Sequence, residues 1–262
     1  MKRRFALWLL LALILAAVLV PWLSPWTQDG IDWQAIRVAP FTDGHILGAD
    51  NMGRDLLTRS FAGLRVSLAI AVAAATTAMV IGMIWGAVAA YLGGLVDGVM
   101  MRFVDIFYAL PFLFLVIVLT LLFGRSLALL FLAIAAVEWL TMARIMRAQT
   151  LSLKVRPFIL AAEAAGLNRF QIIVRHILPN IFGLALVYAA ISVPNVVMAE
   201  SFLSFLGLGV QEPATSLGLL IKEGADDMET APHILMSSGG LMLMLLASLT
   251  LVSEQLRKGW QA

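Results

Sequence analysis

The sequence predicts an all-α, polytopic membrane protein with six transmembrane helices. Its composition is the first reason, because 61% of the 262 residues are hydrophobic and only 13% are charged, whereas soluble chains contain roughly 45–50% apolar and about 25% charged residues. The second reason is that six apolar runs each approach the ~20 residues that a helix needs to cross a ~30 Å hydrocarbon core. Only helices or a closed barrel satisfy their backbone hydrogen bonds in lipid, and these continuous runs lack the alternation of barrel strands.

The first apolar run follows the basic start Met-Lys-Arg-Arg and has two interpretations. A cleavable secretory signal is one of them, but the run exceeds the roughly 7–15 residue core of such a signal, and no small-x-small cleavage site precedes Pro21. We therefore expect an uncleaved anchor helix. The six expected spans cover residues 5–23, 66–92, 103–123, 127–146, 180–200 and 234–252.

The distribution of lysine and arginine predicts which ends of the spans face the cytoplasm. With the amino terminus inside, twelve of the eighteen basic residues are cytoplasmic, and so are both termini. Three arginines at the outer end of the second span oppose this orientation, although Asp50 and Asp55 offset them in part. The cytoplasmic set is Lys2, Arg3, Arg4, Arg102, Arg144, Arg147, Lys154, Arg156, Arg169, Arg175, Arg257 and Lys258, and the outer set is Arg37, Arg54, Arg59, Arg65, Arg125 and Lys222.

Residues 50–65, which precede the second span, have the pattern of a helix. Asp50 or Asn51 can cap it, and Asp55 with Arg59 makes an i,i+4 ion pair. Its apolar face could lie on the membrane or on a partner, but we favour a packed helix that leads into the second span. Two short connections predict a compact antiparallel arrangement of spans two to four, and these are residues 93–102 and 124–126.

Residues 148–179 form the only sizeable cytoplasmic segment in this arrangement. Pro157 suits the first turn of a helix, where its missing N–H costs nothing, and residues 158–165 are strong helix formers. Gly166 can adopt a positive φ and end that helix, and Asn168 can cap the next one. We expect a short helix, a sharp turn and a return helix that project from the membrane. The alternative is an ordinary helical hairpin between two spans.

Several polar residues lie within the expected spans, and two of them could line a substrate path. Glu138 is near the middle of the fourth span, where an ionisable group is costly unless it is paired or hydrated. It therefore either faces a substrate path or forms a structural pair within the subunit. Asn195 follows Pro194 in the fifth span, where it either contacts substrate or marks a kink with a satisfied amide. Gly82 and Gly86 allow two helices to approach closely, and we expect this packing within the subunit.

Other polar residues have structural interpretations. We expect Glu200 to be structural at the outer end of the fifth span, and Asp105 to lie with Arg102 at the inner interface. The absence of cysteine excludes disulfides and thiolate metal sites. The three histidines are far apart in the sequence, so we expect no metal site. No GxSxG or HExxH motif is present, so we expect no catalytic residue and no enzymatic activity.

Several blocks resemble the ABC importer permeases for dipeptides, oligopeptides and nickel. The run Gly48-Ala-Asp-Asn-Met-Gly-Arg-Asp55, followed by Arg59 and Arg65-Val-Ser-Leu68, resembles the family's GTDxxGRDxxSR…RVSL signature. The run Pro157-Phe-Ile-Leu-Ala-Ala-Glu-Ala-Ala-Gly166 resembles its EAA loop, a short cytoplasmic helix that docks into an ATPase. Further blocks match in order and spacing, and these are Trp139 to Leu153, Arg175 to Asn180 and Glu200 to Gln211. The arrangement is similar to the C-type subunit, which pairs with a longer B-type partner.

This resemblance implies a type I ABC importer permease fold. Residues 1–65 would form an anchor helix and an extracytoplasmic segment, and residues 66–262 would form the transmembrane domain with its coupling loop at about 148–179. The implied partners are a B-type permease subunit, two ABC ATPases, an extracytoplasmic substrate-binding protein and the lipid of a bacterial inner membrane. The net charge of +2 gives no indication of nucleic acid. The expected ATPase-coupling residues are Pro157, Leu160, Ala161, Ala162, Glu163 and Gly166.

The chain contains no GxxxxGK[ST] phosphate loop. ATP and Mg are therefore expected on the partner ATPase, and no cofactor is expected on this chain. Peptides are the substrate class expected first, and nickel or another small solute is the alternative. A protein of a different class, a proton-coupled secondary transporter, would rely on Glu138.

The chain departs from the family pattern within the coupling loop. Counted back from Gly166, the EAA positions fall on Leu160, Ala161 and Ala162, so leucine replaces the glutamate and Glu163 lies three positions later. A specific salt bridge at the first position is therefore not expected, whereas the coupling role is. We expect Ala161 and Ala162 to be small because they press into a groove on the ATPase. The tail at 254–260 also lacks the family's LRDxLDP ending.

Overall fold

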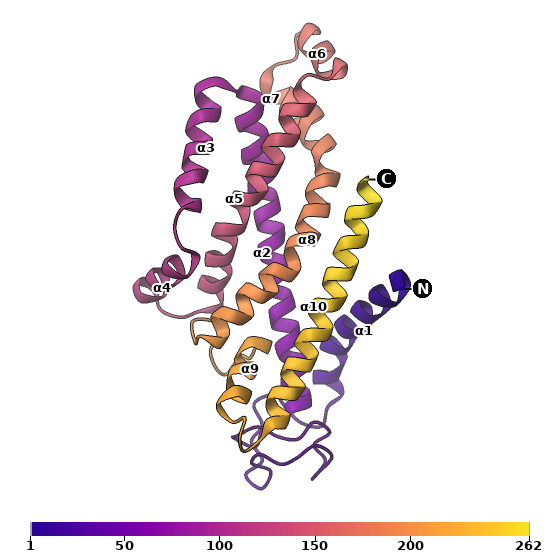
Figure 1. Ribbon diagram of the computed structural model, residues 1–262, viewed down its shortest axis with the longest axis vertical. Helices are drawn as coiled ribbons and strands as arrows, with labels where there is room; N and C mark the ends of the chain where they lie inside the picture. Colours follow the sequence, from indigo (N-terminus) through magenta and orange to yellow (C-terminus); the bar gives the residue numbers. More distant parts are fainter. Residues whose placement is uncertain (1, 262) are drawn as a thin grey trace.

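The computed structural model describes residues 2–261 as an elongated bundle of helices (Figure 1). The loop 24–55 lies at one end of the long axis, and α6 lies at the other. No β-strand is present within the described residues, which confirms the all-α prediction. The elements are α1 (Lys2–Leu23), α2 (Leu56–Leu92), α3 (Gly94–Tyr108), α4 (Phe112–Phe123), α5 (Leu127–Lys154), α6 (Pro157–Ala164), α7 (Arg169–Ile172), the π-helical segment η1 (Ile173–Ile177), α8 (Leu178–Phe205), α9 (Leu217–Asp226) and α10 (Pro232–Gln261).

Five stretches of helix in the described chain are long and apolar enough to cross a membrane. The sixth candidate is the pair α3 and α4, which is bent by 81°. The prediction of a loop at 93–102 before a span at 103–123 is therefore wrong, because residues 94–108 are helical and the helix is interrupted at 109–111. Helix α3 begins directly after Gly93, which has φ 68°, and it ends before Pro111. Proline lacks an N–H and disfavours helical backbone in the residue before it, so the chain turns there.

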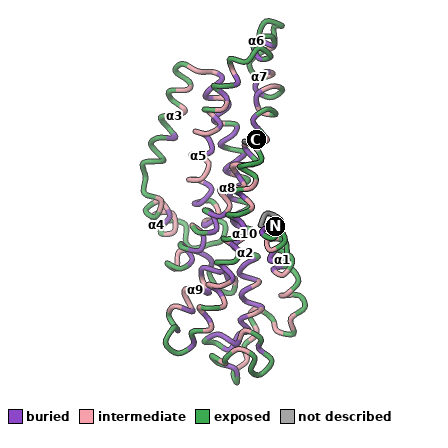
Figure 2. The backbone as a smooth tube through the Cα atoms, turned by 45° about the vertical axis from the view of Figure 1, so that its right-hand side comes forward, coloured by how far each residue is buried: buried purple, intermediate pink, exposed green. Residues whose placement is uncertain are grey.

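The helix α2 is the central element of the bundle. It has 37 residues and is therefore about 55 Å long at 1.5 Å per residue, which exceeds a ~30 Å hydrocarbon core. It packs against α1, α5, α8 and α10, and Figure 2 shows it largely buried while α3 and α4 are largely exposed. Residues 50–65 do not form a separate surface helix. Asp55 caps α2 directly, because its carboxylate accepts from the backbone N–H of Thr58 at 2.8 Å.

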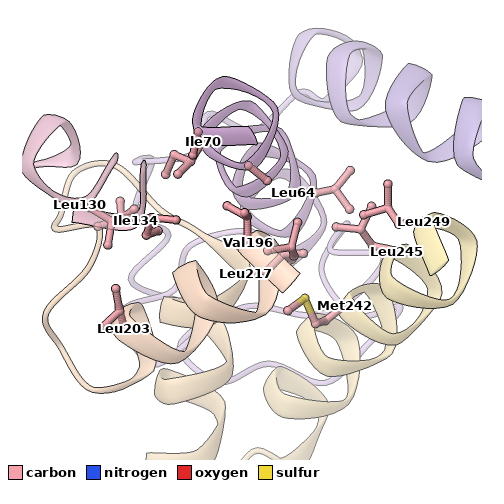
Figure 3. Packing of buried hydrophobic residues seen from close by; sticks show 14 of the residues in the cluster. Leu64, Ile70, Leu130, Ile134, Val196, Leu203, Leu217, Met242, Leu245 and Leu249 are labelled. Carbon is pink, nitrogen blue, oxygen red and sulfur yellow. The ribbon is translucent and has the colours of Figure 1, made fainter. Parts of the chain in front are cut away.

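Close packing of α2 on α5 depends on two glycines. A Cβ placed on Gly82 would lie 2.6 Å from the Cβ of Met142, and one on Gly86 would collide with the carbonyl of Ala143. The expectation that these glycines serve packing within the subunit is confirmed. Elsewhere in the bundle, apolar side chains from α2, α5, α8, α9 and α10 form a separate cluster (Figure 3), and its members include Leu64, Ile70, Leu130, Ile134, Val196, Leu203, Leu217, Met242, Leu245 and Leu249.

A buried network of charges fixes the end of the molecule that carries the loop 24–55. Arg59 is only 2% exposed and pairs with Asp50 and, at 2.8 Å, with Glu223 of α9. Arg54 bonds to Asp50 at 2.8 Å and to Glu212 at 2.8 Å. Burial alone would lower the pKa of Arg54, but the hydrogen bonds to Glu212 and Asp50 outweigh it and raise that pKa. The predicted pair of Asp55 with Arg59 is therefore wrong.

Asp55 instead joins a second buried group. Its carboxylate lies 2.8 Å from Nδ1 of His45, and the imidazole stacks on Trp26 with ring centroids 4.3 Å apart.

Glu200, expected to be structural, is fully buried and accepts hydrogen bonds from Ser67 at 2.7 Å and Ser204 at 2.8 Å. The loop 24–55 is thus a packed layer of the structure that is tied to α2 and α9.

We predict that Arg59→Met destabilises the protein by about 3–5 kcal/mol, because it leaves carboxylates buried without their partner. The midpoint of thermal unfolding in detergent measures this effect. Arg65→Met is the matched control, since Arg65 lies on the same helix but is exposed. Equal midpoints for the two variants would contradict the structural role of the network.

Candidate functional site

The segment predicted to be the coupling loop, at about 148–179, lies at the end of the bundle opposite the loop 24–55 (Figure 1). Its part between α5 and α8, residues 155–177, projects from the bundle and keeps the name coupling loop below. It contains α6, α7 and the π-helical segment η1 between the long helices α5 and α8. The predicted short helix, turn and return helix are all present. The return helix is not separate from the fifth span, however, because α7, η1 and α8 continue without a break from Arg169 to Phe205.

The sequence determines both ends of α6. Pro157 occupies the first turn, as predicted. At the other end Gly166 has φ 83°, its N–H bonds to the carbonyl of Glu163 at 3.0 Å, and the N–H of Leu167 bonds to the carbonyl of Ala162 at 3.2 Å. This pair of hydrogen bonds is the Schellman motif, in which the residue of positive φ reverses the chain. The turn at Gly166 is therefore formed as expected.

The return helix begins with a reciprocal cap. The side chain of Asn168 accepts from the N–H of Gln171 at 2.8 Å, and the side chain of Gln171 accepts from the N–H of Asn168 at 3.0 Å. This capping box satisfies two backbone donors at once. The π-helical turn follows because Pro179 has no N–H for the helical ladder, and the N–H of Leu178 reaches back to Ile173 instead.

The two faces of α6 differ in their contacts. Ile159 and Ala162 are buried against Met146, Ile172 and their neighbours in this same chain. Ala162 thus has to be small because of packing within the subunit, and its Cβ is turned away from the free surface. The exposed members of the expected set are Pro157, Leu160, Ala161, Glu163 and Gly166.

Two hydrogen bonds hold the end of α2, one to Glu163 of α6 and one to Lys154, the last residue of α5. The hydroxyl of Tyr91 donates to the carboxylate of Glu163 at 2.8 Å. The ammonium of Lys154 donates to the backbone carbonyl of Tyr91 at 2.8 Å. Sequence reasoning missed Tyr91 because 72 positions separate it from Glu163, and no local pattern marks such a contact.

A cleft of about 490 Å³ lies at the base of the coupling loop. Three segments form it, namely the end of α5, the start of α6 and the start of α8. Its lining is mixed in polarity and consists of Gln149, Ser152, Leu153, Arg156, Pro157, Phe158 and Asn180. An open, partly polar cleft beside an exposed helix can receive side chains from a neighbouring protein.

The same end of the bundle is braced by ion pairs between α3 and α5. Arg147 binds Asp97 through two contacts of 2.6 Å. Arg144 binds Asp105 at 2.8 Å and lies over the ring of Tyr108. The partner of Asp105 is therefore supplied by α5, and the expected place of Asp105 and Arg102 at the inner interface stays a prediction.

The two residues expected in a substrate path are not brought together with the coupling loop. Glu138 lies in α5 and is half-buried, and in the described part of the chain it has no ion-pair or hydrogen-bond partner. The structural pair considered for it is therefore absent from residues 5–259, whose side chains are described. Asn195 is exposed on α8, next to the buried Pro194. In the described residues no group of three potential metal ligands occurs.

Known proteins resemble this chain along most of its length. Residues 78–256 match the family described as Binding-protein-dependent transport system inner membrane component, and residues 4–40 match the N-terminal TM domain of oligopeptide transport permease C. The oligopeptide transport system permease protein OppC of Haemophilus influenzae is 45% identical over 232 residues, which are 88% of this chain and 75% of that protein. OppC of Escherichia coli K12 is 45% identical over 230 residues, with 87% and 76% covered.

A dipeptide relative is also similar. The dipeptide transport system permease protein DppC of Bacillus subtilis is 42% identical over 185 residues, which are 71% of this chain and 58% of that protein. The family match covers more than half of the chain and includes the coupling loop. This chain therefore belongs to the family of binding-protein-dependent transport system inner membrane components.

Proposed function

We propose that this chain is the C-type membrane-spanning subunit of an ATP-driven importer of peptides. The observation that carries the proposal is the projecting coupling loop on a bundle of membrane-spanning helices, in a chain with 45% identical relatives named oligopeptide permeases. A B-type permease subunit, two ATPases and an extracytoplasmic binding protein would complete the importer. The relatives named here are peptide permeases, so peptides are favoured over nickel or another small solute.

The coupling loop would transmit ATPase closure to the membrane. Leu160 and Ala161 present an exposed face for the ATPase, and the cleft at the base of the loop offers a place for its side chains. Movement of α6 would pass to α2 through the bond between Glu163 and Tyr91. Because α2 packs on α1, α3, α5, α8, α9 and α10, its displacement would change the packing of the whole bundle between inward and outward arrangements.

The proposed function requires this chain neither to bind and hydrolyse ATP nor to transport protons. ATP and Mg would be bound by the partner ATPase, since the sequence has no phosphate loop. Both termini and the coupling loop would be cytoplasmic, in agreement with the excess of lysine and arginine there. A proton-coupled carrier would not need a projecting loop that is shaped to dock with another protein.

Glu138 is proposed to line the substrate path. A half-buried carboxylate without a partner in its own described chain needs water, a substrate group or a second subunit beside it. Asn195 is proposed as a second contact because its amide is exposed on α8.

The first prediction for the coupling loop concerns its turn. Gly166→Val should place a β-branched residue at φ 83°, with strain of about 1–2 kcal/mol, which corresponds to roughly tenfold less of the correct loop conformation. ATPase co-purification and peptide uptake should both fall, while membrane insertion stays normal. Gly166→Asn is the control, since asparagine tolerates a positive φ.

Ala161→Asp places a charge on the exposed face of α6 and should impair ATPase binding without unfolding the loop. Ala162→Asp should instead lower the amount of folded protein, because Ala162 is buried in its own subunit. Normal uptake by both Gly166→Val and Ala161→Asp, at confirmed protein levels, would refute the coupling assignment.

The orientation can be tested by labelling, because the chain has no cysteine. Asp43→Cys and Asp226→Cys should react with an impermeant thiol reagent in intact cells, and Asn168→Cys should react only after the membrane is opened. All three positions are exposed, so accessibility within the protein does not confuse the readout. Labelling of Asn168→Cys alone in intact cells would reverse the orientation.

Glu138→Gln should change the rate of peptide uptake while the abundance and the assembly of the complex stay normal. Glu138 has no ion-pair partner in the described residues, so the substitution leaves no opposite charge unpaired. Glu200→Gln is the control, since Glu200 is buried and accepts from two serines, and its loss should lower abundance. Unchanged uptake with Glu138→Gln would remove this residue from the path.

A further inference from the structure

A second cleft lies between α8 and α10, away from the coupling loop, and has a volume of about 220 Å³. Helix α8 contributes Ile191, Pro194 and Asn195, and α10 contributes Thr250, Ser253, Glu254 and Arg257. Most of these side chains are polar, although both helices belong to stretches that are apolar enough to cross a membrane. Glu254 and Arg257 lie beyond the predicted span 234–252, at its expected cytoplasmic end, and both are exposed.

Pro194 and Ser253 together fix the base of this cleft. Proline has no N–H, so the carbonyl of Ala190, one turn earlier, loses its helical partner. The hydroxyl of Ser253 donates to that carbonyl at 2.8 Å across the helix interface. The helix α8 therefore continues through Pro194, and α10 is held against it at the point where Asn195 is exposed. The cleft has a defined shape rather than being a gap between two loosely packed helices.

The charges of the cleft are not used within the chain. Glu254 and Arg257 are one helical turn apart on α10, so they share a face. Neither residue has an ion-pair partner within 4.0 Å in the part of the chain whose side chains are described, and they do not pair with each other. One carboxylate, one guanidinium and one amide thus border the same space without engaging one another.

We propose that this cleft binds the two charged ends of a short peptide. Glu254 accepts hydrogen bonds from the peptide ammonium, Arg257 donates to the terminal carboxylate, and the amide of Asn195 bonds to the peptide group between them. Each added residue lengthens an extended peptide by about 3.3–3.6 Å, so the ends of a dipeptide or tripeptide fall within reach of two flexible side chains one turn apart. The proposal rests on the proposed function, which makes peptides the substrate.

A zwitterionic lipid headgroup carries the same pair of charges, as an ammonium and a phosphate. The amide of Asn195 favours the peptide, because it offers a donor and an acceptor that match a peptide group. A headgroup presents no amide between its charges. The cleft would therefore hold substrate on its way through the subunit rather than lipid that surrounds it.

The experiment uses Thr250→Cys as a reporter in the complex purified from the membrane and placed in vesicles. The chain has no other cysteine, so the rate of alkylation by a small uncharged maleimide reports access to the cleft. Tri-alanine at millimolar concentration should slow this rate several-fold, and N-acetyl-tri-alanine amide, which lacks both charges, should not. Lys258→Cys is the matched control, since it is exposed on α10 outside the cleft, and its rate should not respond.

The protection should be lost with Glu254→Gln and with Arg257→Gln, each combined with the reporter. The exchange Glu254→Arg with Arg257→Glu should restore part of it, which a role in folding alone would not explain. Protection by glycerophosphoethanolamine but not by tri-alanine would overturn the proposal in favour of a lipid site. Equal protection by the acetylated amide, or no protection by any compound, would also overturn it.

The ATPase content of the same preparation is measured in parallel. Alkylation of the reporter cysteine does not depend on ATP hydrolysis. If no ATPase subunit co-purifies, the proposed function is contradicted, and the effect of tri-alanine on the alkylation rate can still be measured. Conversely, a preparation that retains the ATPase but shows no protection would refute the peptide site alone.

Discussion

The buried ion network around Arg59 fixes the positions of the loop 24–55, the start of α2 and α9 relative to one another. The guanidinium of Arg59 is almost completely buried, and its partners Asp50 and Glu223 are 9 and 164 positions away in the chain. Arg54 and Glu212 extend the same network. An unpaired charge in that position would cost several kcal/mol, so the loop 24–55, the start of α2 and α9 have to be in place together. The other long helices of the bundle pack against α2, whose first turn is held by this network.

The opposite end of α2 makes the contact with the coupling loop. Tyr91 and Arg59 are 32 positions apart on one uninterrupted helix, which corresponds to about 48 Å. The glycines at 82 and 86 press α2 against α5 between these two points. A single helix therefore joins the contact with α6 to the buried network at the far end of the molecule.

The polar groups along the bundle fall into two kinds. Glu200, with its two serine donors, and the pairs between α3 and α5 are satisfied within the chain and stabilise it. Glu138, Asn195 and the charges of the cleft between α8 and α10 have no such partners in the described residues. This division separates residues that hold the fold from residues that are available to a substrate or to a second subunit.

The sequence by itself determined the membrane class, the approximate positions of the spans and the details of the coupling loop. Those features depend on local chemistry: apolar length, the missing N–H of Pro157, the positive φ of Gly166 and the cap at Asn168. The bend between α3 and α4 was also signalled locally, by Pro111, although a continuous apolar run concealed it.

Only the tertiary structure decided which charged residues meet. Asp55 was expected to pair with Arg59 by helical spacing, but Asp55 caps α2 and contacts His45, and Arg59 is drawn to α9 instead. Asp105 pairs with Arg144 from α5, and Tyr91 reaches Glu163. Such pairs depend on how distant helices pack, because a polar side chain bonds to whichever partner the folded backbone brings within about 3 Å. No spacing within one segment encodes that choice.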